Sequence, residues 1–482
     1  MTTITFNEGM FNDKFALLDK KPEIIVTECS LPLTPPPEEI NESPFWTTEN
    51  PIQVEEVQTL NTSEPESIVA VIGVGYVGTH LVEAFANHYN VIAFDLSTKR
   101  LDEVSKQLTG LPIQFTSNAA DISQATHVLI SVPTILTDDK KVDTTYLRSA
   151  IATVEKYVKP GSTIVVESSV AVGMTRELVG PLMASKNFKV GMSPERVDPG
   201  RTFPAFEDIS KIVSGLDAAS LESISTLYGR VFNKLLPVSS PEVAEMTKLY
   251  ENCQRMVCAT YANEMADACS SIGIDAFEVS NAAASKPFGY LPFRPGPGIG
   301  GHCIPVNPYY LLSNLHMPLL EHAATISSSR PRDVARNFVR SVLQEKNYSV
   351  DSSQLRLLVV GVGFKRGQSV MSNSPGAAIA HTLKSEYNCH IEFADPLVST
   401  ALYSAAPKMD TETNWTVDHL STYDGIIVSV NQEGLDMDVL ANLPSSVKVH
   451  DFSGILKNSI SSVPSLAAKK EICQEIIVSV TF

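Results

Sequence analysis

The sequence predicts an α/β protein with two doubly wound domains joined by a central helical domain, and three observations carry this prediction. An apolar run at 68–72 meets a glycine-rich turn and a helical pattern, and apolar and helical stretches then alternate for about 150 residues. Residues 242–271 contain neither glycine nor proline, which is typical of one long helix. A second apolar run at 355–360 meets another glycine turn, where a second alternating unit begins.

Each element is expected where its pattern is clearest. In the first α/β unit, continuous apolar runs indicate strands that are buried on both faces of a parallel sheet, at 68–72, 91–95, 128–132 and 163–166. The middle section is expected to hold helices over 241–271, 275–285 and 319–345, enough to connect the two units and to form a homodimer. The second unit has strands at 355–360, 391–395, 425–430 and 447–451, with a helix after Pro375.

These patterns divide the chain into four parts. We expect a disordered acidic tail (1–66), an N-terminal α/β domain (67–238), a central helical domain (239–345) and a C-terminal α/β domain (346–482). The tail is rich in glutamate and contains three consecutive prolines, so it can bury little apolar surface. Alternatively, part of it forms a short helix that docks on a partner, through Phe11, Phe15, Leu17 and Leu18.

Composition excludes several classes of protein. The 43% hydrophobic and 19% charged content is that of a globular protein, and no apolar run approaches the roughly 20 residues of a membrane span. The tail holds thirteen acids and three lysines, so the remaining body is only mildly acidic, which argues against nucleic acid as a partner. Seven scattered cysteines and the lack of a signal peptide predict a reducing, cytoplasmic location. No metal site is predicted.

The first glycine turn predicts a dinucleotide site. Its three glycines, Gly73, Gly75 and Gly78, surround Tyr76 and Val77 at the spacing that allows a tight turn, close approach of backbone to a pyrophosphate, and close helix packing. Asp95 follows at the end of the next strand, where its carboxylate would accept hydrogen bonds from ribose hydroxyls and repel a 2′-phosphate. The expected cofactor is therefore NAD, and the domain is Rossmann-like.

The second glycine turn is incomplete. Gly361 and Gly363 are followed by Arg366 where a third glycine is expected, so the helix is not expected to pack as a dinucleotide site requires. One interpretation is a second Rossmann-like domain without a ligand. The preferred one is nucleotide contact, because Phe364 and Lys365 offer an aromatic ring and a cation to a base and phosphates.

A cysteine in a glycine-dense loop is the candidate nucleophile. Cys303 follows Gly300, Gly301 and His302, and backbone without side chains allows close approach of a ligand. A free cysteine is often an inert small apolar residue, but this loop does not favour apolar burial. Three other cysteines lie in the long helix without such a setting and are interpreted as packing residues: Cys253, Cys258 and Cys269.

Four polar residues are candidates for the chemistry around this thiol. Lys248 and Asn252 lie four apart on the long helix and face the same way, so they can stabilise an oxyanion together; alone they would be a solvated pair. Glu167 ends a strand, and Glu195 lies in a Ser-Pro-Glu-Arg segment. Either carboxylate can activate a water, and each can equally be a cap or a surface acid.

With these residues in view, the chain resembles the UDP-glucose/GDP-mannose dehydrogenase family over about residues 67–480. The resemblance implies that a nucleotide sugar's C6 alcohol is oxidised twice with two NAD, with Cys303 as the thiohemiacetal and thioester nucleophile. It further implies oxyanion stabilisation by Lys248 and Asn252, proton transfer or hydrolysis by Glu195, and Thr134 and Glu167 at the cofactor and water site. The expected substrate-binding residues are Arg294, Gly300, Gly301, Phe364 and Lys365. The motifs that carry the resemblance are Gly73 to Gly78, Val132-Pro133-Thr134, Glu167-Ser168-Ser169-Val170, Pro194-Glu195-Arg196, Lys248-Leu249-Tyr250-Glu251-Asn252 and Gly300-Gly301-His302-Cys303.

The chain also departs from the family pattern. The family usually has aspartate four residues after the cysteine, where this chain has Asn307, and an arginine at the position of Ser372. The usual Asn-Asp pair before Met-Pro is replaced by the segment 327–331, and Arg366 is a candidate for the missing cation. The cysteine loop itself is similar to that of the branch acting on UDP-N-acetylhexosamines.

The sequence therefore predicts an NAD-dependent UDP-sugar 6-dehydrogenase, with a UDP-N-acetylhexosamine as the preferred substrate. UDP-glucose is the first alternative. A catalytically impaired nucleotide-sugar-binding homologue is the second, suggested by Asn307 and Ser372 and opposed by the retained Cys303, Lys248 and Glu195. A scaffold role through the tail is a further option.

Overall fold

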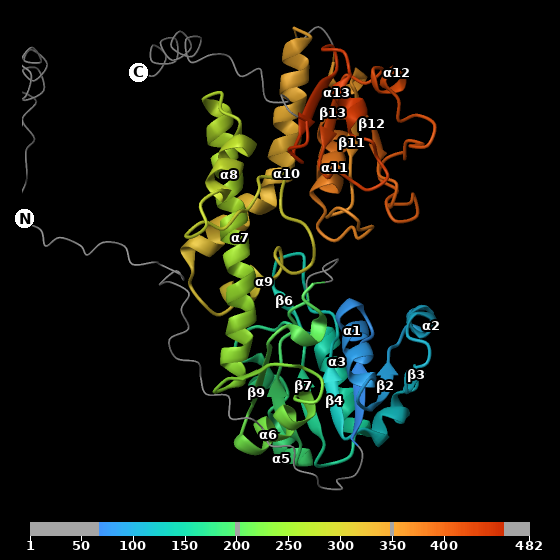
Figure 1. Ribbon diagram of the computed structural model, residues 1–482, viewed down its shortest axis with the longest axis vertical. Coiled ribbons are helices and arrows are strands. Elements are labelled where there is room, and N and C mark those ends of the chain that lie inside the picture. Colours follow the sequence, from blue (N-terminus) through green and yellow to red (C-terminus); the bar gives the residue numbers. More distant parts are fainter. Residues whose placement is uncertain (1–66, 198–202, 348–350, 457–482) are drawn as a thin grey trace, which may run out of the picture. The chain divides into compact units, whose positions relative to one another are not determined.

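The structure is a computed structural model that describes residues 67–197, 203–347 and 351–456. The expectations for the acidic tail (1–66) and for the end of the C-terminal domain (457–482) lie outside the described residues. Within them, strands alternate with helices in two α/β units, each built on its own mainly parallel sheet, and long helices lie between these two units in the sequence (Figure 1). This confirms the predicted α/β class with two Rossmann-like domains and a central helical region.

The N-terminal domain is built on an eight-stranded sheet with the order β10-β9-β8-β7-β4-β1-β2-β3. All neighbours pair in parallel except β8 and β9, which are antiparallel. Its strands are β1 (Ile68–Ile72), β2 (Asn90–Phe94), β3 (Ile113–Thr116), β4 (His127–Ile130), β7 (Thr163–Val166), β8 (Lys189–Met192), β9 (Lys211–Gly215) and β10 (Leu235–Pro237). Its helices are α1 (Tyr76–Ala86), α2 (Thr98–Gln107), α3 (Thr145–Tyr157), α4 (Met174–Leu178), α5 (Pro181–Lys186) and α6 (Ala218–Tyr228), with short 3₁₀ turns η1 (Ala119–Gln124) and η2 (Phe206–Asp208).

The apolar runs form strands here because both faces of the sheet are covered. In β1, Ala70 and Ile72 belong to one buried cluster, while Val69 and Val71 belong to another on the opposite face. Successive side chains of a strand point to opposite faces, so a strand between two helix layers needs apolar residues at every position. A small antiparallel hairpin, β5 (Ile135–Leu136) and β6 (Val142–Asp143), follows β4 outside this sheet.

The central region consists of α7 (Pro241–Ser271), α8 (Ala276–Ala284), α9 (Asn307–Leu312) and α10 (Pro318–Glu345). The sequence predicted α7 with the same bounds. It begins where Ser240 accepts a hydrogen bond from the Val243 N–H and Pro241 occupies the first turn, where its missing N–H leaves no bond unmade. α7 packs against α9 and α10, and this packing places the segment before α9 beside α7.

The C-terminal domain has a four-stranded parallel sheet with the order β12-β11-β13-β14. The strands are β11 (Arg356–Val360), β12 (His390–Ala394), β13 (Gly425–Val428) and β14 (Lys448–Asp451). Its helices are α11 (Pro375–Tyr387), α12 (Val417–Leu420) and α13 (Asp438–Ala441), with η3 (Ser352–Gln354) before β11. α10 packs against α11, so the last central helix is also part of the C-terminal core.

One expectation about the second glycine turn is wrong. The helix that follows it does pack closely, because Gly376 at the start of α11 takes the role expected of a third glycine: a Cβ there would overlap the carbonyl oxygen of Gly361. Residues 364–374 are inserted between turn and helix, so spacing alone misassigned the position to Arg366. Asp395 also closes this turn, since its carboxylate accepts hydrogen bonds from the Val362 and Gly363 N–H groups at 3.0 and 2.9 Å.

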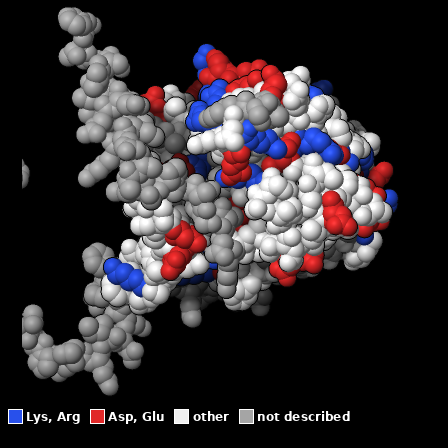
Figure 2. Space-filling model, turned by 90° about the horizontal axis from the view of Figure 1, so that it is seen from above, with Lys and Arg blue, Asp and Glu red and all other residues white. Residues whose placement is uncertain are grey.

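The surface carries charges of both signs. Where Figure 2 shows described residues, basic and acidic side chains lie in small neighbouring groups. Within the described ranges, no helix combines the length and the apolar character that crossing a bilayer requires.

Candidate active site

The first glycine turn has the shape of a dinucleotide cradle. Gly73 has φ +89°, and a Cβ there would lie 2.5 Å from the carbonyl oxygen of Ser131. A Cβ on Gly78 would overlap the carbonyl oxygen of Gly73, so this glycine allows α1 to start close to β1. Gly75, which caps α1, faces open space instead. The turn is therefore closed by two glycines and open at the third, on the side where the α1 N-terminus can accept an anion.

Asp95 and Arg100 complete this cradle. Asp95 ends β2, and its carboxylate accepts from the N–H of Val74 at 2.8 Å and from that of Ser97 at 2.8 Å, which leaves acceptor capacity for ribose hydroxyls. Arg100 donates to the Val74 carbonyl at 2.8 Å and lies beside the turn. The donor set, the open Gly75 and the acceptor at Asp95 fit NAD. Arg100 was not singled out from the sequence, because a single arginine in an exposed helix carries no signal.

The cysteine loop is held in place by the C-terminal domain. The N–H of Gly301 donates to the Ser372 carbonyl at 2.8 Å, and Asn373 donates to the Gly301 carbonyl at 3.0 Å. Phe364 lies directly over the loop: a Cβ on Gly300 or Gly301 would be within 3.0 Å of its side chain. The two glycines are therefore needed for close packing of this loop against Phe364, in addition to any contact with a ligand.

Four candidate residues meet at this loop. Lys248 and Asn252 are buried on one face of α7. Asn252 donates through its amide nitrogen to the side-chain oxygen of Asn307, and the Asn307 N–H donates to the Cys303 carbonyl at 2.9 Å. Burial lowers the pKa of Lys248, while the charges of Cys303 and Glu195 act in the opposite direction. The structure thus brings the thiol residue, the cation and the amide pair together.

Glu195 adds a carboxylate with an open position. The residue is buried, and one of its oxygens accepts from the N–H of Val197. Its second oxygen, Oε2, is buried and has no hydrogen-bond partner among the described residues. A buried carboxylate oxygen without a partner costs free energy, so it indicates a group that binds there, such as a water or a substrate hydroxyl. The Glu195 charge raises the pKa of Lys248 against the effect of burial, so the two groups lie close to each other.

Glu167 differs from Glu195, because both of its oxygens are occupied. It is completely buried at the end of β7, where Lys211 donates to Oε2 at 2.6 Å and the Tyr228 hydroxyl donates to Oε1. The pKa of Glu167 is raised to about 7: burial is the largest cause, the Lys211 charge acts against it, and the nearby Glu195 charge adds to it. The structure therefore places Glu167 in the protein interior next to Glu195, with a side-chain donor on each of its oxygens, and its place at the cofactor and water site stays a prediction.

Thr134 lies at the junction of the NAD domain and the cysteine loop. Its carbonyl is 3.0 Å from the Nε2 atom of His302, the residue before the thiol. This contact ties the segment after β4 to the loop, and sequence reasoning missed it because 168 residues separate the two partners.

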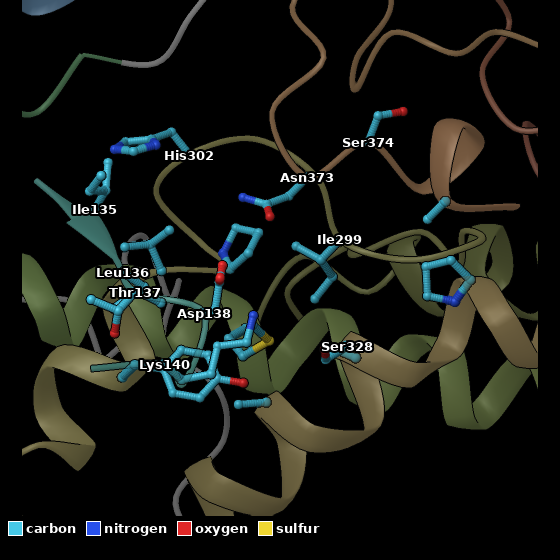
Figure 3. A pocket seen from close by; sticks show the side chains of 18 residues that line it. Ile135, Leu136, Thr137, Asp138, Lys140, Ile299, His302, Ser328, Asn373 and Ser374 are labelled. Atoms are coloured by element: carbon cyan, nitrogen blue, oxygen red, sulfur yellow. The ribbon is translucent and has the colours of Figure 1, made fainter. Parts of the chain in front are cut away.

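A cavity of about 430 Å³ lies next to the cysteine loop. His302 and Ile299 border it on the loop side, Lys140 belongs to the β5–β6 hairpin, and Asn373 belongs to the C-terminal domain (Figure 3). Cys303 is not among the residues that line this cavity.

Three cationic residues that the sequence singles out are exposed. Arg294 donates to Asn281 at 3.3 Å. Lys365 is exposed in the second glycine turn. Arg366, the candidate for the missing cation, is exposed and donates to the Asn431 carbonyl at 3.1 Å. Their roles in substrate binding stay predictions.

Comparison with known proteins gives the family. Residues 67–232 match the NAD binding domain of the UDP-glucose/GDP-mannose dehydrogenase family, and residues 242–329 match its central domain. Protein CapL of Staphylococcus aureus is 33% identical over 351 residues, which cover 68% of this chain and 81% of CapL. UDP-N-acetyl-D-glucosamine 6-dehydrogenase of Pseudomonas aeruginosa is 30% identical over 387 residues, which cover 75% of this chain and 90% of that protein.

Solved structures show the same fold. UDP-D-ManNAc dehydrogenase from Pyrococcus horikoshii superposes with a TM-score of 0.72 at 24% identity, covering 83% of this chain and 98% of that one. A UDP-glucose dehydrogenase from Pyrobaculum islandicum gives a TM-score of 0.70 at 21% identity, covering 82% and 96%. With the dinucleotide cradle and the thiol cluster in place, the sequence matches lead to one conclusion: the chain belongs to the UDP-glucose/GDP-mannose dehydrogenase family and is an NAD-dependent dehydrogenase.

Proposed function

We propose that the protein oxidises the C6 hydroxyl of a UDP-sugar to the UDP-uronic acid, with Cys303 as the covalent nucleophile. The observation that carries this proposal is the convergence of Cys303, Lys248, Asn252 and Glu195 at one loop. A protein that only binds a nucleotide sugar has no need for a buried cation beside a thiol, since burying an ammonium group costs free energy.

The chemistry follows from what these residues can hold. NAD, bound at the glycine turn, would supply the acceptor for the hydride that leaves C6 in each of two oxidations. Lys248 and the Asn252 amide stabilise negative charge on the C6 oxygen. The Cys303 sulfur adds to the aldehyde carbon, which gives a thiohemiacetal, and the second oxidation gives a thioester. Glu195 accepts a proton from the water that breaks the carbon–sulfur bond and regenerates the thiol. The sum is UDP-sugar, two NAD⁺ and one water to UDP-uronate, two NADH and three protons.

We infer that a UDP-N-acetylhexosamine is the preferred substrate. The proposal is supported by the names of two relatives: the P. aeruginosa protein is a UDP-N-acetyl-D-glucosamine 6-dehydrogenase, and a Methanococcus vannielii protein with 27% identity is a UDP-N-acetyl-D-mannosamine dehydrogenase. UDP-glucose stays the alternative.

We further propose a homodimer in a reducing, cytoplasmic compartment. The five cysteines in the described part of the chain are unpaired, as expected for such a compartment. Exposed apolar side chains follow one side of α7 and continue toward α8, which supports association through the central helices. They include Tyr250, Tyr261, Met265, Ile272 and Val279.

The test is NADH formation by the purified protein with NAD and, separately, UDP-GlcNAc, UDP-ManNAc, UDP-glucose and UDP-galactose. Turnover with an N-acetylated donor that exceeds turnover with UDP-glucose supports the proposal, and the reverse order favours the alternative. Binding of a UDP-sugar without NADH formation from any donor would instead support a catalytically impaired homologue, with Asn307 and Ser372 as its marks.

A further inference from the structure

Lys211 is a buried cation that the reaction described above does not use. It begins β9, and its side chain is only 3% exposed. Its ammonium group pairs with Glu167 at 2.6 Å and lies 3.5 and 3.4 Å from the carbonyl oxygens of Ser193 and Pro194. Those carbonyls belong to the two residues directly before Glu195. The ammonium group of Lys211 therefore connects Glu167, whose two oxygens both have donors, to the segment that carries Glu195, whose Oε2 has none among the described residues.

The backbone reinforces the same connection. The Glu195 N–H donates to the Glu167 carbonyl at 3.3 Å, and the Ser193 N–H donates to the Val166 carbonyl at 3.0 Å. These backbone hydrogen bonds hold residues 193–195 by continuing the pairing of β7 with β8 beyond the ends of the two strands. After Pro194 the chain leaves the sheet, and the side chain of Glu195 turns back to accept from the Val197 N–H. At this point side chains hold the segment: Lys211 donates to the Ser193 and Pro194 carbonyls before Glu195, and Arg196 after it donates to the Ser210 carbonyl at 2.8 Å.

We propose that Lys211 is a positioning residue: by bridging Glu167 and the carbonyls of Ser193 and Pro194, it holds Glu195 with Oε2 open toward Lys248 and the reacting carbon. The inference rests on the proposed function of Glu195 and deepens it. The mechanism needs a carboxylate that is fixed and yet has one free oxygen, and such an arrangement must be held by neighbouring groups.

The free energy of burying charges argues against the interpretation that the Lys211–Glu167 pair only stabilises the fold. A buried ion pair loses the hydration of both charges, and apolar side chains of similar size would often fill the same space at no loss of stability. The aromatic rings of Tyr228 and Phe232 already surround the ammonium, at 5.8 and 5.5 Å, so the surroundings are suited to an apolar residue. The charge of Lys211 is present in these apolar surroundings and close to Glu195, whose Oε2 has no hydrogen-bond partner among the described residues. This combination indicates that Lys211 has a role in the active site.

The charge of Glu167 controls this bridge. The groups that face it are Lys211 from β9, the Tyr228 hydroxyl from α6, and Glu195, which itself faces Lys248 from α7. Since the pKa of Glu167 is about 7, protonation below that pH removes the ion pair and weakens the bridge. Turnover should therefore decline as pH falls through about 7.

The experiment compares four variants of the full-length protein. Lys211→Met removes the bridge, and the double variant Lys211→Met/Glu167→Gln removes it without leaving an unpaired buried carboxylate. Tyr228→Phe keeps the ring and the bridge but removes a hydroxyl whose hydrogen bond lowers the pKa of Glu167. Lys189→Met, at the opposite end of β8, is the matched control.

Two measurements test whether Lys211 positions Glu195: amide hydrogen exchange, which does not depend on activity, and steady-state kinetics. Hydrogen exchange at the Glu195 and Val197 amides should become at least about tenfold faster in the double variant and stay at the wild-type rate in the control. With an active wild type, kcat should fall about tenfold or more in both Lys211 variants, while KM for NAD and for the sugar stays within about twofold. Tyr228→Phe should move the acid limb of kcat to higher pH and keep the plateau.

The outcomes separate this inference from the proposed function. Unchanged exchange in the double variant overturns the inference, whatever the turnover. Wild-type kcat in that variant, or an equal loss of plateau in Tyr228→Phe, also overturns it and leaves the dehydrogenase function intact. If the wild type itself forms no NADH with any donor, the proposed function fails, and the exchange measurement alone still decides whether Lys211 holds Glu195.

Discussion

At the scale of single residues, the site contrasts two carboxylates in different states. Glu167 has both oxygens occupied, by Lys211 and Tyr228, whereas Glu195 has one oxygen that is buried and unpartnered. The sequence places both acids after strands and cannot tell them apart. Their difference arises from Lys211 and Tyr228, which are distant in the sequence, and it favours Glu195 as the proton acceptor in the proposed reaction.

The nucleophile gives the first prediction. Cys303→Ser should reduce formation of the uronic acid by roughly a thousand-fold or more, because a hydroxyl adds to the aldehyde less readily and its ester is not the activated thioester. NAD binding should stay within about twofold of the wild type, since the glycine turn lies in another part of the chain. Product analysis and NAD titration check this. Wild-type acid formation by the serine variant would rule out covalent catalysis by Cys303.

The second prediction concerns Asn307. Asn307→Asp should preserve or raise turnover, because a carboxylate oxygen can accept from the Asn252 amide as the present amide oxygen does. Asn307→Ala is the matched control: it leaves the buried Asn252 amide without this acceptor, which costs about 1–3 kcal/mol. Steady-state kcat for both variants is the measurement. A clear loss in the aspartate variant would mean that the site has been rebuilt around the amide.

At the scale of elements, two glycines of the turn before α1 have different roles, one in binding NAD and the other in packing the helix. Gly75→Ala should weaken NAD binding tenfold or more and leave the melting temperature unchanged, since its Cβ meets no protein atom. Gly78→Ala should instead destabilise the N-terminal domain by about 1–3 kcal/mol, because its Cβ overlaps the Gly73 carbonyl. Calorimetric titration and thermal unfolding distinguish the two. Equal effects of both substitutions on stability would contradict this account of the turn.

Much of the fold could be predicted because its elements follow from local patterns. The strand at 163–166 and the helix at 241–271 have the bounds that the sequence predicts, since buried apolar runs and a glycine-free helical stretch are local signals. The packing role of Gly376 could not be predicted, because the loop at 364–374 breaks the expected spacing. The same holds for Lys211: a lysine at the start of an apolar strand resembles an exposed strand end until tertiary packing buries it.

At the scale of the whole molecule, the exposed apolar side of α7 predicts association. Tyr261 and Met265 are 61% and 40% exposed and lie one turn apart on this helix. Light scattering after size exclusion should give about twice the 52.3 kDa of one chain. The double substitution Tyr261→Glu and Met265→Glu should shift this mass toward the monomer, because it places charges in an apolar interface. A wild-type mass of one chain at micromolar concentration would contradict the dimer.

The proposed reaction is a four-electron oxidation of one carbon that stays covalently bound to Cys303 between the two oxidations. The most direct test is the number of NADH molecules formed per UDP-sugar when the preferred donor is limiting and the reaction runs to completion. We expect two NADH for each sugar, with UDP-uronate as the product and no free aldehyde. One NADH per sugar with a released aldehyde would contradict it, because the thiol of Cys303 would then not retain the carbon for the second oxidation.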